Sequence, residues 1–139
     1  MSTNHQSNLA EAKIHLEFAR NNCHVAIPRN GSLPYDMIAD VAGKLFKVQI
    51  KSTSSTDGKM RIKVQRTRVR ADGTKVYKGY DKEDFDWLAV HDMTTDKCFM
   101  FGPEHFVGAS NLIVWYDNPK ASRHSKDFEM LVVLRTINR

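Results

Sequence analysis

Residues 35–51 of the chain read YDMIADVAGKLFKVQIK, a pattern typical of a tight β-hairpin. Two runs of apolar and β-branched residues flank Ala42-Gly43, and the glycine can adopt the positive φ that a two-residue turn requires. If Val41 pairs with Lys44 across this turn, the register of every other pair in the hairpin follows. The sequence therefore predicts two antiparallel strands in one defined register.

Side chains alternate between the two faces of such a hairpin. The predicted register places Asp36 opposite Gln49, with Lys51 on the same face. Because directly opposed Cβ atoms lie about 4.5–5.5 Å apart, a carboxylate and an amide oxygen gather with an ammonium at one end. The other face is expected to be apolar and to comprise Tyr35, Met37, Ala39, Val41, Phe46, Val48 and Ile50. The polar end is suited to holding a hard cation and a phosphate, which predicts a nuclease.

This pattern resembles the PD-(D/E)XK nuclease superfamily, in which an Asp on one strand is followed on the next strand by Glu-x-Lys. The matching residues are 33–36 (LPYD) and, after twelve intervening positions, 49–51 (QIK). Tyr35 separates the proline from the Asp, and Gln49 replaces the acidic ligand and so removes a charge from the metal site. Within the superfamily the chain looks most like the Gln-bearing branch of group I intron homing endonucleases.

Those homing endonucleases also open with a Glu-containing helix, like the one expected from Asn8 onward, and the likeness extends to about Phe101. The resemblance implies an α/β fold with a restriction-endonuclease-like core, in which helices flank a central mixed β-sheet. It implies double-stranded DNA as substrate and Mg²⁺ as cofactor, with Mn²⁺ as a substitute. It also implies assembly as a tetramer, which lets a small protein cover a long target.

Magnesium prefers oxygen ligands and keeps several waters, so one or two carboxylates and a carbonyl suffice to bind it. We expect Asp36 to be the principal ligand, with the side-chain oxygen of Gln49 or the backbone carbonyl of Ile50 as a neutral second ligand. Lys51 would lie near the attacking water and lower its pKa, or stabilise the pentavalent phosphate. Because Gln49 brings no charge, Glu11 becomes the candidate second carboxylate.

Each of these residues also has a purely structural interpretation. Asp36 could be a strand-edge carboxylate, although aspartate is depleted in strands, and Gln49 could hydrogen-bond the backbone. Glu11 could complete a capping box with Asn8 at the start of the helix. Asp40 lies beside the turn and is expected at the surface, with a metal-ligand role as the alternative if Glu11 does not complete the site.

The net charge of +5 is distributed unevenly. Residues 59–82 contain nine basic and two acidic side chains, a balance of +7, so the rest of the chain carries −2. Clustered positive charge beside a metal-binding hairpin indicates a polyanionic partner such as DNA or RNA. The expected DNA contacts are Lys59, Arg61, Lys63, Arg66, Arg68, Arg70, Lys75 and Lys78.

The 139 residues suffice for one domain, residues 1–139, in which we expect residues 1–7 to be disordered. The start of the chain lacks signal-peptide character, and no apolar run reaches the roughly 18 residues that span a membrane. Two cysteines are too few for a disulfide framework or a zinc site. These features favour an intracellular, cytoplasmic protein without membrane association or a small-molecule cofactor.

A helix is expected over residues 8–22, with Leu9, Ala12, Leu16 and Ala19 as its apolar row, widened by Ile14 and Phe18. Alternation in residues 60–65 predicts a strand with one cationic face, and Asp72-Gly73 predicts the turn of a hairpin arm. Further expected elements are a strand at 25–27, buried strands at 85–90 and 97–101, a short helix at 103–106 and a strand at 112–115. The segment 125–139 is compatible with either a helix or a strand.

The predicted function is a magnesium-dependent DNA endonuclease of the homing type. The alternatives are a restriction-like or junction-resolving nuclease, a nucleic-acid-binding module with a vestigial site, and an interaction domain with no nucleic-acid role. A double-strand break needs two sites, which predicts a homodimer or homotetramer. Apolar residues at 112–115 and 131–134 are candidates for that interface.

Overall fold

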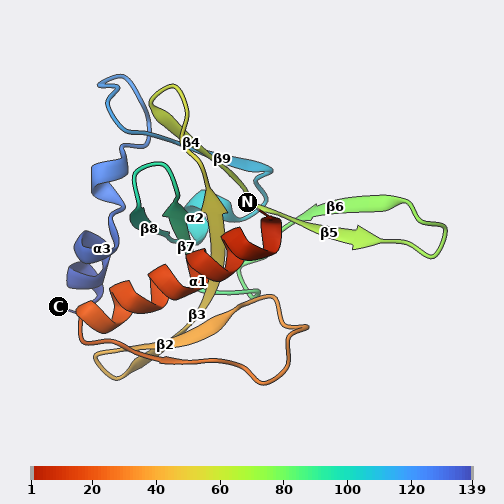
Figure 1. Cartoon of the computed structure of the whole chain (residues 1–139), viewed down its shortest axis with the longest axis horizontal. Coiled ribbons are helices and arrows are strands. Elements are labelled where there is room, and N and C mark those ends of the chain that lie inside the picture. Colours follow the sequence, from red (N-terminus) through yellow and green to blue (C-terminus); the bar gives the residue numbers. More distant parts are fainter. Residues whose placement is uncertain (1, 139) are drawn as a thin grey trace.

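The computed structural model describes residues 2–138, which form an α/β sandwich around a central sheet (Figure 1). The sheet has five strands in the order β1-β2-β3-β7-β8. Their bounds are β1 His24–Ala26, β2 Met37–Val41, β3 Lys44–Thr53, β7 Trp87–Asp92 and β8 Lys97–Phe101. Strands β3 and β7 are parallel, whereas the other neighbouring pairs are antiparallel. This mixed sheet confirms the predicted fold class.

Helices and smaller sheets cover the two faces of the central sheet. One face carries α1 (Thr3–Arg20) and α3 (Met130–Ile137), and α3 resolves the ambiguous end of the chain as helix after a short 3₁₀ turn. The other face carries α2 (Pro103–Phe106) and the pair β4 (Lys59–Lys63) and β9 (Asn111–Trp115). Among the described residues, no helix combines the length and apolar character that crossing a membrane requires.

Strands β5 (Gln65–Val69) and β6 (Lys75–Gly79) pair only with each other and project from the body as the predicted hairpin arm (Figure 1). Gly79, at the end of β6, lies where the arm joins the rest of the protein. A Cβ at Gly79 would lie 3.2 Å from the Cα of Gly108, so the backbone of the arm approaches the 107–109 loop closely. The arm is therefore held against the rest of the protein near the end of β6.

The β2–β3 hairpin has the register that the sequence predicts, from Val41↔Lys44 to Met37↔Val48. Ala42 and Gly43 both have positive φ, as a type I′ turn requires. The ladder ends one pair earlier than predicted, because the chain bends at Asp36 and is not paired there with Gln49.

The bend also changes the surroundings of Tyr35. We expected Tyr35 on the same apolar face as Met37, but it packs against the cluster on the opposite face of the sheet. The remaining residues of the predicted apolar face, among them Met37, Val48 and Ile50, do pack together beneath α1.

Helix α1 differs from its prediction in both start and phase. Ser2 is the N-cap and accepts a hydrogen bond from the His5 N–H, so residues 3–7 are helical rather than disordered, and Asn8 and Glu11 form no capping box. Residue 1 lies outside the described residues. Ile14 and Phe18, which were predicted to widen the apolar row, are buried together with Ala10. The predicted row itself is exposed and comprises Leu9, Ala12, Leu16 and Ala19.

Two apolar clusters form the core, one on each face of the sheet. The α1 side contains Ile14 and Phe18 with the alternate side chains of β2 and β3. The opposite side contains Met60, Ile62 and Val64, the three apolar residues of the predicted alternation. Leu112 and Val114, which we considered for an interface between chains, are fully buried in this second cluster.

Alanine substitutions on α1 distinguish the observed helix phase from the predicted one. Ile14→Ala should lower the free energy of unfolding by about 2–5 kcal/mol, because Ile14 is 0% exposed and its loss leaves a cavity. Leu16→Ala should change it by less than about 1 kcal/mol, because Leu16 is 43% exposed. Urea unfolding of both variants measures the difference, and equal losses would contradict the observed phase.

Candidate active site

A cleft of about 340 Å³ opens at the end of the β2–β3 hairpin, where β2 has ended and α1 passes alongside. Its lining residues are Thr3, Ser7, Ala10, Glu11, Asp36, Gln49, Ile50, Lys51 and Ser52. The cleft thus brings together the five residues that the sequence analysis assigned to catalysis or metal binding. Asp40 does not line it. Instead, Asp40 Oδ1 accepts a hydrogen bond of 2.9 Å from the Gly43 N–H and supports the turn.

Asp36 is held by backbone groups of β3. Its N–H donates to the Val48 carbonyl at 2.8 Å, and its Oδ2 accepts from the Ile50 N–H, also at 2.8 Å. The Asp36 carboxylate therefore extends the hydrogen bonding between β2 and β3 by one position beyond Met37, the first residue of β2. Burial raises the pKa of Asp36, and the Ile50 N–H and the charge of Lys51 oppose this rise.

Glu11 reaches the same cleft from α1. Thr3, Ser7 and Glu11 are spaced four residues apart and so lie on one face of the helix, which turns toward the cleft. Although Glu11 is largely exposed, partial desolvation and the negative charge of Asp36 raise its pKa. Two carboxylates therefore share the cleft, and the charge of Asp36 disfavours the ionised form of Glu11.

Gln49 and Lys51 lie on β3 between the apolar residues that pack beneath α1. Strand alternation directs both side chains to the opposite face of the sheet, and both are half-buried. The Lys51 Nζ lies 5.6 Å from the ring centroid of Tyr80, a residue at the root of the β5–β6 arm. Lys51 therefore has a defined position rather than a freely moving one in solvent.

The oxygen atoms in the cleft suit a hard divalent cation. Asp36 and Glu11 offer carboxylates, Gln49 offers an amide oxygen, and Ile50 offers its backbone carbonyl. Because the N–H and C=O of a strand residue point to the same side, the Ile50 carbonyl faces the side on which Asp36 accepts from its N–H. Within residues 2–138 no three His, Cys, Asp or Glu side chains gather in a metal-binding group, so neutral oxygens must complete any site.

The sequence analysis missed three polar residues of the cleft as well as Tyr80. Thr3 and Ser7 escaped notice because residues 1–7 were assigned to a disordered segment, although their spacing to Glu11 is a helical signal. Ser52 directly follows Lys51 but was not among the predicted site residues. No local pattern marks Tyr80, which lies 29 positions after Lys51.

The basic residues of 59–82 divide between two elements outside the cleft. Lys59, Arg61 and Lys63 point outward from β4, because Met60 and Ile62 between them are buried. On the arm, cross-strand pairing places Arg66 and Arg68 on one face. The side chains of Arg68, Arg70, Lys75 and Lys78 are exposed.

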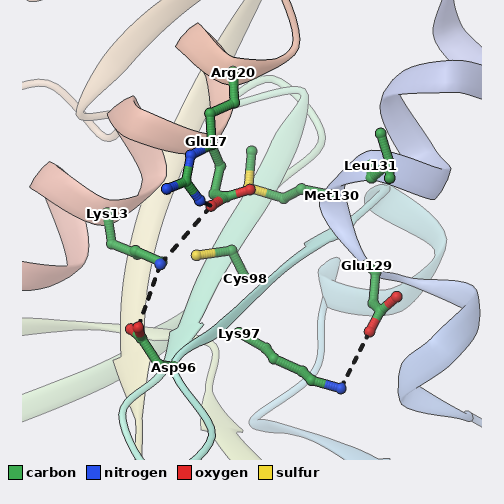
Figure 2. Close-up of a pocket in the computed structure, with 9 residues that line it drawn as sticks. All are labelled: Lys13, Glu17, Arg20, Asp96, Lys97, Cys98, Glu129, Met130 and Leu131. Carbon is green, nitrogen blue, oxygen red and sulfur yellow. Dashed lines mark hydrogen bonds and ion pairs between the residues drawn. The ribbon is translucent and has the colours of Figure 1, made fainter.

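A second cleft, of about 280 Å³, lies between α1, β8 and α3, and its charges are paired within the protein (Figure 2). Figure 2 shows Lys13 between Glu17 and Asp96. The Lys13 Nζ lies 3.9 Å from Glu17 Oε1 and 3.3 Å from Asp96 Oδ2. Hydrogen bonds from His91 and Lys13 hold the pKa of Asp96 below its usual value. Burial and the charge of Glu17 raise the pKa of Cys98 to about 12, which makes its thiol a poor nucleophile.

Comparisons with known proteins identify the family and the fold of the chain. A family model described as PD-(D/E)XK endonuclease matches residues 1–132. The chain is also similar to the solved structure of a bacterial homing endonuclease, I-Ssp6803I, with a TM-score of 0.80 and 22% sequence identity over 98% of this chain and 95% of that chain. At this identity the likeness establishes a shared fold. A search of the curated proteins gave no significant match. Because the family model spans nearly the whole described chain, the protein belongs to the PD-(D/E)XK endonuclease family.

Proposed function

We propose that this endonuclease is magnesium-dependent and hydrolyses phosphodiester bonds of double-stranded DNA at a specific site, as a homing endonuclease does. The observation that carries the proposal is the gathering of Glu11, Asp36, Gln49 and Lys51 in one cleft. The fold shared with a bacterial homing endonuclease supports the homing type.

The proposed cation ligands are Asp36, Glu11, the Gln49 amide oxygen and the Ile50 carbonyl. When bound, a divalent cation lowers the pKa of water and neutralises phosphate charge. The raised pKa values of Asp36 and Glu11 support this assignment, because a bound cation would favour the ionised forms that burial and, for Glu11, the charge of Asp36 disfavour. Lys51 presents its ammonium to the scissile phosphate and stabilises the negative charge that develops there.

We propose that the outward-facing cations of β4 and the arm bind the DNA backbone. A two-stranded β-ribbon fits the major groove of B-DNA, and the arm has this form. The arm projects beyond the rest of the protein (Figure 1). Its exposed side chains Arg68, Arg70 and Lys75 could then contact the DNA phosphates that flank the groove.

One observation favours a second function. Gln49 stands where the family pattern has an acidic ligand, which would suit a DNA-binding module that has lost catalysis. Metal-dependent cleavage of a plasmid by the wild-type protein distinguishes the two, since the module would bind the plasmid and leave it intact.

The first prediction concerns Asp36. Asp36→Asn should reduce cleavage by at least about 100-fold while leaving the DNA dissociation constant nearly unchanged, because it removes the principal cation ligand. Mg²⁺ should raise the melting temperature of the wild-type protein and not that of the variant. Without metal the variant should be at least as stable as wild type, because a desolvated carboxylate has been removed.

Asp40→Asn is the matched control, because it neutralises another aspartate of the same hairpin outside the cleft and preserves an acceptor for the Gly43 N–H. It should cleave DNA and respond to Mg²⁺ as wild type does. Normal cleavage by Asp36→Asn, or its loss in Asp40→Asn, would show that the metal site is wrongly assigned.

The second prediction concerns the arm. Replacing Arg68, Arg70 and Lys75 together by Gln should weaken DNA binding and reduce the slope of log K against log salt by about 2.7, or about 0.9 for each lost phosphate contact. A control with Lys44, Lys120 and Lys126 replaced by Gln changes the net charge equally but lies outside the arm. DNA-binding titrations at several salt concentrations give this slope for both variants. Equal slopes for the arm variant and the control would show that DNA binds to a surface other than the arm.

The third prediction concerns assembly. Each chain carries one set of the proposed catalytic residues, so we propose that cleavage of both strands requires a homodimer or homotetramer. Leu131 and Val132 of α3 and Leu9 and Leu16 of α1 are exposed apolar residues available to such contacts. Light scattering of the protein with and without DNA should give two or four times the chain mass of 15.9 kDa. A monomer that only nicks DNA would contradict this assembly.

A further inference from the structure

Tyr80 connects the candidate active site with the root of the arm. It follows β6 directly and is 4% exposed. Its ring centroid lies 5.6 Å from Lys51 Nζ and 5.7 Å from Arg66 Cζ, both within the range of cation–π attraction. One buried ring therefore contacts the lysine of the cleft and an arginine of the arm.

The surroundings of Tyr80 hold this ring in place. Phe85 packs against it edge to face, with centroids 4.8 Å apart, and Phe106 packs against Phe85 at 4.5 Å. The Tyr80 carbonyl accepts a hydrogen bond from the Gly108 N–H at 3.2 Å. The ring is thus a rigid support built from both backbone and core contacts.

The two cations on the ring differ in their other partners. Arg66 also forms an ion pair with Asp84, and Asp84 in turn accepts a hydrogen bond of 2.8 Å from the Asp81 N–H. Arg66 is therefore anchored to the β6–β7 connection. Lys51 has a flexible four-carbon stem, so its contact with a fixed ring restricts where its ammonium can lie.

We propose that Tyr80 is a positioning residue that holds the Lys51 ammonium at the cleft and ties its position to the root of the arm. The inference rests on the proposed role of Lys51 in cleavage. The ring, rather than the phenolic hydroxyl, performs this task, so phenylalanine should replace tyrosine with little loss and an aliphatic residue should not.

Single-turnover cleavage with saturating protein tests the inference, because it separates the rate of the chemical step from DNA affinity. Tyr80→Leu should lower the rate constant by about 10-fold with an unchanged dissociation constant, whereas Tyr80→Phe should retain most of the rate. Phe99→Leu is the matched control, since it removes a buried ring from the same core cluster whose aromatic partner is Tyr116 rather than Tyr80, and it should cleave normally.

A second measurement needs no cleavage. The methylene protons of Lys51 should show an upfield ring-current shift in NMR spectra, retained in Tyr80→Phe and lost in Tyr80→Leu. If Tyr80→Leu does not fold, Tyr80→Met takes its place, because it conserves bulk without a ring.

A wild-type rate in Tyr80→Leu, a change confined to DNA affinity, or the absence of the NMR shift would overturn the inference. Absence of cleavage by the wild-type protein would instead overturn the proposed function, and the NMR shift would still decide the position of Lys51.

Discussion

The hydrogen bond from the Ile50 N–H to the Asp36 carboxylate is the contact on which the cleft depends. Strand β2 begins at Met37, so it does not reach Ile50 of β3, and without this bond the Ile50 N–H would lack a partner on that side. A side chain thus replaces the missing strand. Because the same carboxylate faces the cleft, the end of the ladder and the candidate metal ligand are one structural feature.

The two carboxylates of the cleft, Asp36 and Glu11, are in surroundings that disfavour their charged forms, and this is the place where we propose catalysis. Elsewhere the protein pairs its charges closely, as in the cleft beside Cys98, where Lys13 contacts two carboxylates. Asp36 and Glu11 instead share one cleft, where the Ile50 N–H and the charge of Lys51 offset only part of the effect of burial on Asp36. Functional sites often contain charges that are not fully compensated by neighbouring groups. Such charges lower the stability of the folded state, and the packing of the rest of the fold must offset this loss.

Much of the fold could be predicted because its signals are local. The hairpin register followed from strand alternation around Ala42-Gly43, and the same alternation identified the buried face of β4. The phase of α1 could not be predicted, because Leu16 and Phe18 are equally apolar in sequence and only packing on the sheet selects between them. Ser2 and Asn8 are likewise equivalent as caps until the helix has a place to dock.

The candidate site divides in the same way. Asp36, Gln49 and Lys51 belong to one hairpin, so their proximity follows from its register. Glu11 depends on a helix docking against that hairpin, and here the family resemblance provided what spacing could not. The position of Tyr80 beside Lys51 depends on a contact between segments that are far apart in the chain, and no periodic pattern in the sequence predicts such a contact.

The isolation of the arm has an evolutionary consequence. Neither core cluster, within the part of the chain that the structure describes, includes a residue from 65 to 79. Substitutions in residues 65–78 are therefore expected to lower the free energy of unfolding only slightly. Gly79 and Tyr80 are closely packed, so substitutions there are expected to lower it more. Related proteins could therefore change the amino acids of residues 65–78, and with them the proposed DNA-contacting surface, while the core and the cleft stay unchanged. Surface loops on a rigid scaffold vary between related proteins in the same way.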